Sequence, residues 1–170
     1  MRYVTHRWVF AASALLHNMA VNEGDSIRVE YVGRFEDGKA FDSSREEVAR
    51  EAGIHDDRRD YEPLDFEVGA GEVVQGFEEG VVGMEEGEKK EVTVPPQKGY
   101  GERSEERLVE YEREEFREAL GEEPEVGMHI HTQDSHGDVI KVEGSDVVVD
   151  FNHELAGETL VFEIEVVEVA

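Results

Sequence analysis

The sequence predicts an α+β fold in which antiparallel strands surround one short helix, and three observations carry this prediction. Apolar and polar residues alternate in three segments, as in half-buried strands: 26–35, 64–68 and 160–169. Four apolar residues are spaced three, four and three apart, the period of one helical face: Val74, Phe77, Val81 and Met84. The composition changes at Glu102, which indicates that 102–151 is a small separate module inserted before the last strand.

The connecting segments predict the remaining elements. Asp37-Gly38 forms a tight turn after the first strand and leads into a second strand over 39–42. Ser43 and Ser44 each precede a glutamate by three residues, the capping-box pattern of a helix that ends near Gly53. The polar residues 54–62 predict a loose surface loop. Further strands are expected at 91–94, around 129–130, at 139–142 and at 147–149, with a short helix at 116–120.

The charge is strongly one-sided. The 170 residues include 43 acidic and 17 basic side chains, a net charge of -26. This charge repels phosphates and anionic lipids, so we expect neither nucleic acid nor membrane as a partner. Because the carboxylates are dispersed among patterned apolar segments, we predict a folded protein with an acidic surface and not a disordered chain. Molar salt, in which the Debye length falls to ~3 Å, would screen this surface, and we hypothesise a high-salt origin.

The first 18 residues differ from the rest, with two arginines, no acidic residue and an apolar run over 8–16. A secretory signal is one interpretation. The other is an extension upstream of a true start at Met19, which we favour because no cleavage motif follows the run. The run is too short to cross a bilayer, and we expect a cytoplasmic protein.

The sequence lacks the motifs of several common catalytic and binding sites. The chain has no cysteine, which excludes disulfides, thiolate zinc sites and a cysteine nucleophile. Gly69-Ala70-Gly71 lacks the third glycine of a dinucleotide-binding loop, and no GxSxG elbow occurs. His129 and His131 would share one face of a strand, but zinc needs further ligands, and only the distant His136 and His153 offer them. We therefore predict no metal site.

Four segments, in this order and spacing, resemble FKBP-type peptidyl-prolyl isomerases: YVGRFEDGKAFDSS at 31–44, GEVVQGFEEG at 71–80, Tyr100-Gly101 and Leu160–Glu163. The resemblance covers 21–101 and 152–170. It implies an FKBP-like antiparallel half-barrel sheet wrapped on a short helix, formed by 19–101 and 152–170. Segments 126–128, 147–150 and 152–157 are similar to the SlyD-like branch, in which an insert-in-flap chaperone domain, here 102–151, replaces the flap loop.

The resemblance implies peptidyl-prolyl cis/trans isomerisation without cofactor or covalent intermediate. Its site residues would be Tyr31, Phe41, Asp42, Val73, Val74, Phe77, Tyr100 and Phe162, with Leu64 and Leu155 nearby. Phe77 stands where many members have tryptophan, and Leu64 where some have phenylalanine, which makes binding of the family's macrolide inhibitors less certain. Asp42 would either orient Tyr31 or face a substrate carbonyl.

The implied partners are unfolded or nascent polypeptides with X-Pro bonds, and we expect a monomer. In the inserted domain, the residues that would hold an unfolded chain are Leu108, Tyr111, Phe116, Met128 and Ile130. An alternative is a holdase chaperone whose isomerase body is weak or inactive. The His/Cys-rich metal-binding tail of the bacterial branch does not follow Ala170, which puts a nickel-handling role in doubt.

Overall fold

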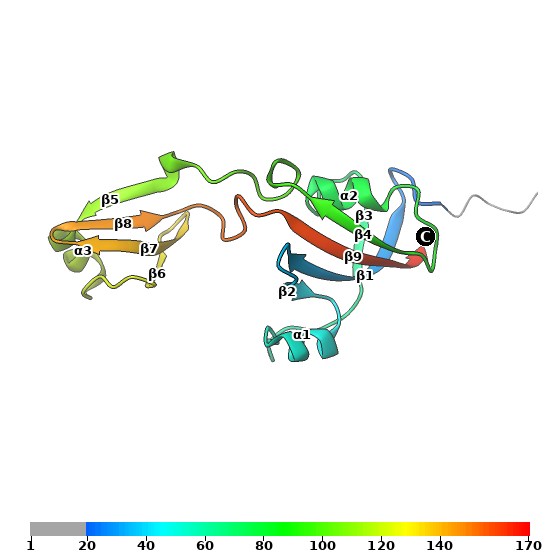
Figure 1. Cartoon of the computed structure of the whole chain (residues 1–170), viewed down its shortest axis with the longest axis horizontal. Coiled ribbons are helices and arrows are strands. Elements are labelled where there is room, and N and C mark those ends of the chain that lie inside the picture. The colour runs from blue at the N-terminus through cyan, green and yellow to red at the C-terminus, as the bar shows by residue number, and fades with distance from the viewer. Residues whose placement is uncertain (1–19) are drawn as a thin grey trace, which may run out of the picture.

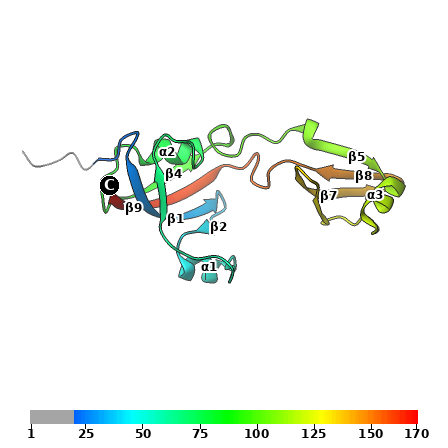
Figure 2. The ribbon, with the colours of Figure 1, turned by 180° about the vertical axis from the view of Figure 1, so that it is seen from behind.

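The chain folds around two antiparallel sheets that lie at opposite ends of an elongated molecule (Figure 1). The computed structural model describes residues 20–170, so the predicted extension over 1–18 lies outside the described residues. Two connecting segments, on either side of the second sheet in the sequence, join the two ends (Figure 2). Within 20–170, no helix combines the length and apolar character needed to cross a bilayer.

The first sheet has the order β2-β1-β9-β4, and β3 pairs with the first half of β1. Its strands are β1 (Ser26–Phe35), β2 (Ala40–Ser43), β3 (Leu64–Glu67), β4 (Lys89–Val94) and β9 (Leu160–Val169). The alternation predicted for β9 is confirmed, since four of its side chains are buried on one face: Leu160, Phe162, Ile164 and Val166. β1 and β9 pair along nearly their whole length, from Ile27 opposite Val169 to Phe35 opposite Leu160.

Helix α2 (Gln75–Val81) packs closely on β4. A Cβ atom at Gly76 would lie 2.7 Å from Val94, and one at Gly80 would lie 2.6 Å from Val92, so these glycines allow the close approach. The predicted helical face reached Met84, but the helix ends at Val81. Gly83 then turns the chain with a φ of 84°, and Met84 is buried beyond the helix.

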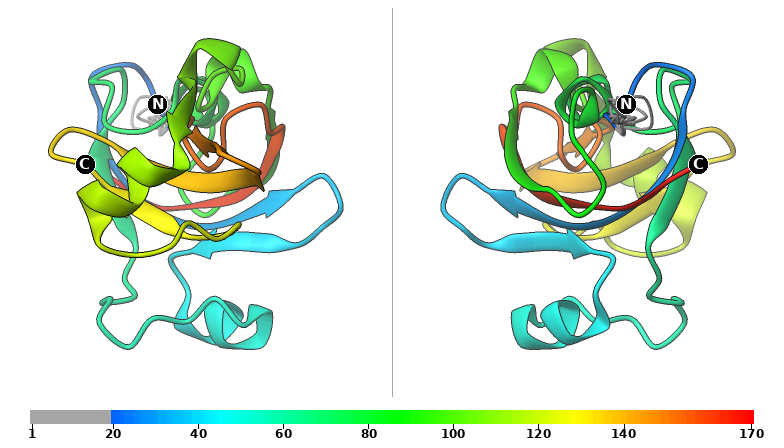
Figure 3. Two further views of the ribbon diagram at one scale, coloured as in Figure 1. Left: turned by 90° about the vertical axis from the view of Figure 1, so that its left-hand side faces the viewer. Right: turned by 90° about the vertical axis from the view of Figure 1, so that its right-hand side faces the viewer.

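Helix α1 (Glu46–Ala52) lies beside the sheet, below β2 in the end-on views (Figure 3). It ends near Gly53, as predicted, and the φ of 73° at Gly53 is left-handed. The predicted capping box is wrong, because the residue before the helix is Arg45 and no side chain caps it. Ser44 Oγ instead accepts the N–H of Tyr31 at 2.9 Å, and Ser43 Oγ accepts the N–H of Arg45 at 3.0 Å. Ser44 therefore fastens the chain to β1.

The second sheet has the order β5-β8-β7-β6. Its elements are β5 (Leu108–Glu112), α3 (Arg113–Leu120), β6 (His129–His131), β7 (His136–Glu143) and β8 (Asp146–Asp150), and short 3₁₀ turns occupy Pro96–Lys98 and Glu105–Arg107. It has its own hydrophobic core, which shares no residue with that of the first sheet: Phe116, Ile130, Val139, Val147 and Val149. The α+β prediction is confirmed. β5 was not predicted, because it is an edge strand with mostly exposed side chains.

Candidate functional site

Aromatic side chains gather on the first sheet around Phe162 of β9. Its ring packs edge-on against three others, with centroids 5.1 Å from Phe77, 5.8 Å from Phe41 and 6.4 Å from Tyr31. Phe77 and Phe162 are buried, whereas Tyr31 and Phe41 are half-buried. The aromatic cluster, meaning these four residues, therefore has a buried floor and a rim that reaches the surface.

Strand pairing creates the space for this cluster. Gly33 of β1 lies opposite Phe162 of β9 and opposite Asp42 of β2. A Cβ atom at Gly33 would lie 2.6 Å from the Phe41 ring and 3.0 Å from the Phe162 ring. Because non-bonded carbon atoms do not approach so closely, the two rings occupy the volume that any other residue would fill.

A polar network fixes the rim. The Tyr31 hydroxyl donates to Asp42 Oδ2 at 2.7 Å, and the Arg59 guanidinium donates both to Asp42 Oδ1 and, at 3.2 Å, to the Tyr31 oxygen. Burial, followed by the hydrogen bond to Asp42, raises the pKa of Tyr31 to about 12. The sequence left two roles open for Asp42, and the structure joins its carboxylate to Tyr31.

Sequence reasoning missed Arg59. The loop that carries it is not loose: the Arg59 guanidinium lies 5.2 Å above the Tyr61 ring, which in turn stacks on His55 at 5.2 Å. The Tyr61 hydroxyl also accepts the backbone N–H of Asp56 at 3.0 Å. A single arginine in a polar segment has no periodic pattern, so only the position of Arg59 beside Asp42 in the structure marks it as part of the site.

Tyr100 lies apart from the aromatic cluster. Its side chain is 40% exposed, and its ring stacks on His153 with centroids 4.2 Å apart and an interplanar angle of 8°. Partial burial, followed by the negative charge of Asp42, raises the pKa of Tyr100. Val73, Val74, Leu64 and Leu155 are partly buried and pack against the same core as the aromatic cluster.

An apolar depression lies on the four-stranded sheet. This apolar groove has a volume of about 220 Å³ and is lined by Tyr111, Glu115, Phe116, Ala119, Leu120, Ile130, Thr132 and Phe151. Three of the five predicted chain-binding residues, Tyr111, Phe116 and Ile130, line it. Of the other two, Leu108 is exposed on β5 and Met128 packs against the core of this sheet, and neither lines the groove.

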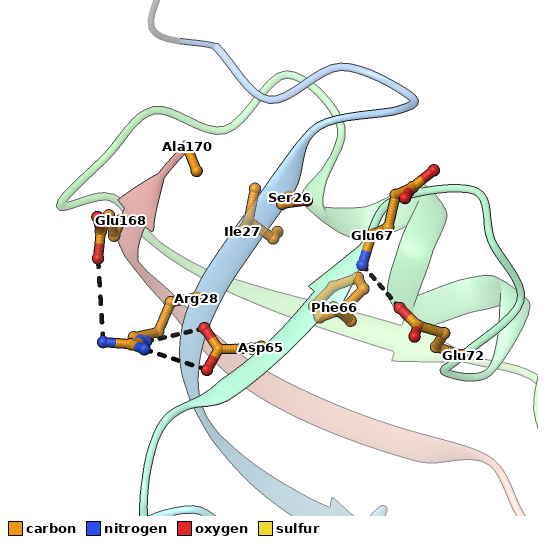
Figure 4. Close-up of a pocket in the computed structure, with 9 residues that line it drawn as sticks. All are labelled: Ser26, Ile27, Arg28, Asp65, Phe66, Glu67, Glu72, Glu168 and Ala170. Atoms are coloured by element: carbon orange, nitrogen blue, oxygen red, sulfur yellow. Dashed lines mark hydrogen bonds and ion pairs between the residues drawn. The ribbon is translucent and has the colours of Figure 1, made fainter.

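A cavity of about 460 Å³ lies at the start of β1, where its lining is mostly polar (Figure 4). Arg28 pairs there with Asp65 at 2.8 Å and lies 3.9 Å from Glu168. None of the residues that line this cavity belongs to the aromatic cluster.

The histidines of the second sheet pair with one another or with carboxylates. His129 Nδ1 contacts Asp138, and His131 Nδ1 lies 2.5 Å from His136 Nδ1. Over residues 20–170, no three histidine, aspartate or glutamate side chains are grouped so that they could hold a metal ion.

Comparison with known proteins identifies the family. Residues 17–167 match the family model for FKBP-type peptidyl-prolyl cis-trans isomerases. The chain belongs to this family. It is 48% identical over 149 residues to the short-type peptidyl-prolyl cis-trans isomerase of Methanocaldococcus jannaschii, which covers 88% of this chain and 94% of that protein.

Other relatives match shorter parts. The SlyD isomerase of Vibrio cholerae is 36% identical over 111 residues, which is 63% of this chain and 54% of that protein. Human FKBP2 is 37% identical over 81 residues, and the match covers 48% of each chain. The chain thus spans about half the length of these two relatives and nearly all of the archaeal one. The resemblance to FKBP-type isomerases seen in the sequence is confirmed.

Proposed function

We propose that this FKBP-type isomerase rotates X-Pro bonds over the aromatic cluster and holds unfolded polypeptide in the apolar groove of a separate inserted domain, 102–151. The observation that carries the first part is the packing of Tyr31, Phe41 and Phe77 around Phe162. The barrier to rotation is ~20 kcal/mol because amide resonance is lost. The twisted bond has a less polar, more ketone-like carbonyl, which an apolar surface favours over the planar amide.

We assign two hydrogen-bond donors to the substrate. The N–H of Val74, directly before α2, donates to no acceptor within residues 20–170, and the Tyr100 hydroxyl makes no hydrogen bond within that range. Both are available to substrate carbonyls. The Tyr31 hydroxyl is already committed to Asp42, so we assign Tyr31 to the wall of the site. Arg59 neutralises Asp42, and the rim therefore carries no unpaired carboxylate at this point.

The first test uses a short X-Pro peptide in molar salt. Tyr100→Phe removes one hydrogen bond, worth about 1 kcal/mol, so we expect kcat/KM to fall roughly five- to tenfold. Tyr61→Phe removes a hydroxyl from the neighbouring loop and keeps the ring under Arg59, so it should stay near the wild-type rate. If folded wild-type protein does not accelerate the peptide, the holdase alternative replaces the isomerase assignment.

The inserted domain supports the second part of the proposal. The two sheets have separate hydrophobic cores, and the groove on the second sheet is lined mostly by apolar side chains. Tyr111 and Leu120 are 36% and 43% exposed at the groove, so their apolar surface is open to a partner. An unfolded chain supplies the extended apolar segments that would cover it. Binding there would raise the local concentration of X-Pro bonds at the aromatic cluster.

A charge placed in the groove tests this division. We expect Leu120→Asp to weaken binding of a labelled unfolded protein at least tenfold and to leave short-peptide turnover unchanged. Val126→Asp is the matched control, since Val126 is 66% exposed and does not line the groove. Equal loss in both variants, or none in either, would contradict a role for the groove.

A further inference from the structure

Tyr100 owes its orientation to a residue from a distant part of the sequence. His153 follows β8 in the segment that returns to the first sheet, and its ring covers the Tyr100 ring face to face at 4.2 Å. Within residues 20–170, this is the one aromatic pair that Tyr100 makes. The outgoing and returning segments lie side by side here (Figures 1 and 2).

His153 is itself held by the backbone. Its Nδ1 accepts the N–H of Leu155 at 3.0 Å, and its carbonyl accepts the N–H of Ala156 at 2.9 Å, so the ring caps the turn that it begins. Since Nδ1 is the acceptor, a neutral His153 carries its proton on Nε2. The His153 ring therefore makes two contacts: its Nδ1 edge binds the N–H of Leu155, and its face stacks on the Tyr100 ring.

Further hydrogen bonds join the two segments on both sides of the stack. The N–H of Gly157 donates to the carbonyl of Gly101 at 2.7 Å. Ser104 and Asn152 exchange two hydrogen bonds, N–H to Oδ1 at 2.8 Å and Nδ2 to carbonyl at 3.0 Å. We call these contacts, together with the stack, the neck. They place His153 against Tyr100 on a braced part of the chain.

We propose that His153 is a positioning residue for the isomerase, which orients the Tyr100 ring so that its hydroxyl points toward the substrate. This inference rests on the proposed function, because it takes Tyr100 as a donor to the substrate carbonyl. The ring face supplies the orientation, and the Nδ1 contact with Leu155 holds the ring in place. His153 does not contact the reacting bond.

Two substitutions separate the two contacts of His153. His153→Phe keeps a ring for the stack and loses the Nδ1 acceptor, whereas His153→Asn keeps a short acceptor for the Leu155 N–H and loses the ring. We expect His153→Asn to lower kcat/KM for a short X-Pro peptide roughly three- to tenfold, the factor that an aromatic pair is worth. We expect His153→Phe to retain most of the activity. His136→Asn, on the exposed hairpin of the second sheet, is the matched control and should match wild type.

The Tyr100 ring protons provide an independent readout by NMR, assigned with Tyr100→Phe. Stacking shifts them upfield, and this shift should be lost in His153→Asn and kept in His153→Phe. The proposal is overturned if His153→Asn keeps both the shift and the activity, or if folded His153→Phe loses as much activity as His153→Asn. If the shift behaves as expected but Tyr100→Phe has wild-type turnover, the stack exists and the catalytic assignment of Tyr100 has failed instead.

Discussion

Alanine at position 33 should damage the site and leave the fold intact. The Gly33 backbone is not in the left-handed region, so alanine introduces no backbone strain. Its methyl group would lie 2.6 Å from Phe41 Cζ and 3.0 Å from Phe162 Cε1. Carbon atoms in contact are 3.5–4.0 Å apart, so the Phe41 ring must move by about 1 Å.

The size of the effect follows from this displacement. Overpacking of this kind costs about 1–3 kcal/mol of folding free energy, which a stable domain tolerates. Displacement of a substrate-contacting group by about 1 Å can cost on the order of 100-fold in rate. Because Phe41 and Phe162 both belong to the aromatic cluster, we expect Gly33→Ala to lower kcat/KM for a short X-Pro peptide about 10- to 100-fold.

Gly137→Ala is the matched control. A Cβ atom at Gly137 would lie 2.7 Å from the Phe151 ring, a comparable overlap of a strand glycine with a phenylalanine, but at the second sheet. Thermal unfolding followed by circular dichroism should show a similar loss in both variants, and the peptide assay should show a rate loss in Gly33→Ala alone. A folded Gly33→Ala protein with wild-type turnover would refute the placement of the site, and equal rate losses would point to general destabilisation.

Three further results are expected. The pKa of Tyr31 is raised from 10.0 to about 12, so between these pH values the folded protein retains a proton that the unfolded chain releases. The free energy of unfolding should therefore fall between about pH 10 and 12. This fall should be steeper in the wild type than in Tyr31→Phe. Arg59→Met leaves Asp42 without its ion-pair partner and should slow peptide turnover several-fold, whereas Arg58→Met, which loses only an exposed pair with Asp56, should stay within about twofold. With a net charge of -26, the protein should gain thermal stability from 0.1 to 2 M salt, and a melting temperature independent of salt would count against adaptation to high salt.

Most of the secondary structure could be predicted from the sequence, because it depends on local patterns. β9 buries every second residue from Leu160 to Val166, β1 does so from Ser26 to Val29, and α1 ends before a left-handed glycine, so alternation and turn chemistry locate them. β5 was not predicted, because an exposed edge strand needs no alternation of apolar and polar residues. The capping-box prediction was wrong because the Ser44 hydroxyl bonds to Tyr31 of β1 and the Ser43 hydroxyl bonds to Arg45. The spacing of the glutamates does not reveal these competing hydrogen bonds.

Arg59 and His153 could not be predicted for a common reason: each acts on a residue far away in the chain. Arg59 and Asp42 lie on opposite sides of α1 in the sequence, and Tyr100 and His153 lie on opposite sides of the whole second sheet. Tyr100 lies before the elements of the second sheet in the sequence and His153 lies after them, so the neck includes a predicted site residue. A movement of the second sheet that separates the two segments must therefore break the stack on Tyr100, so the neck connects the second sheet physically to a predicted site residue.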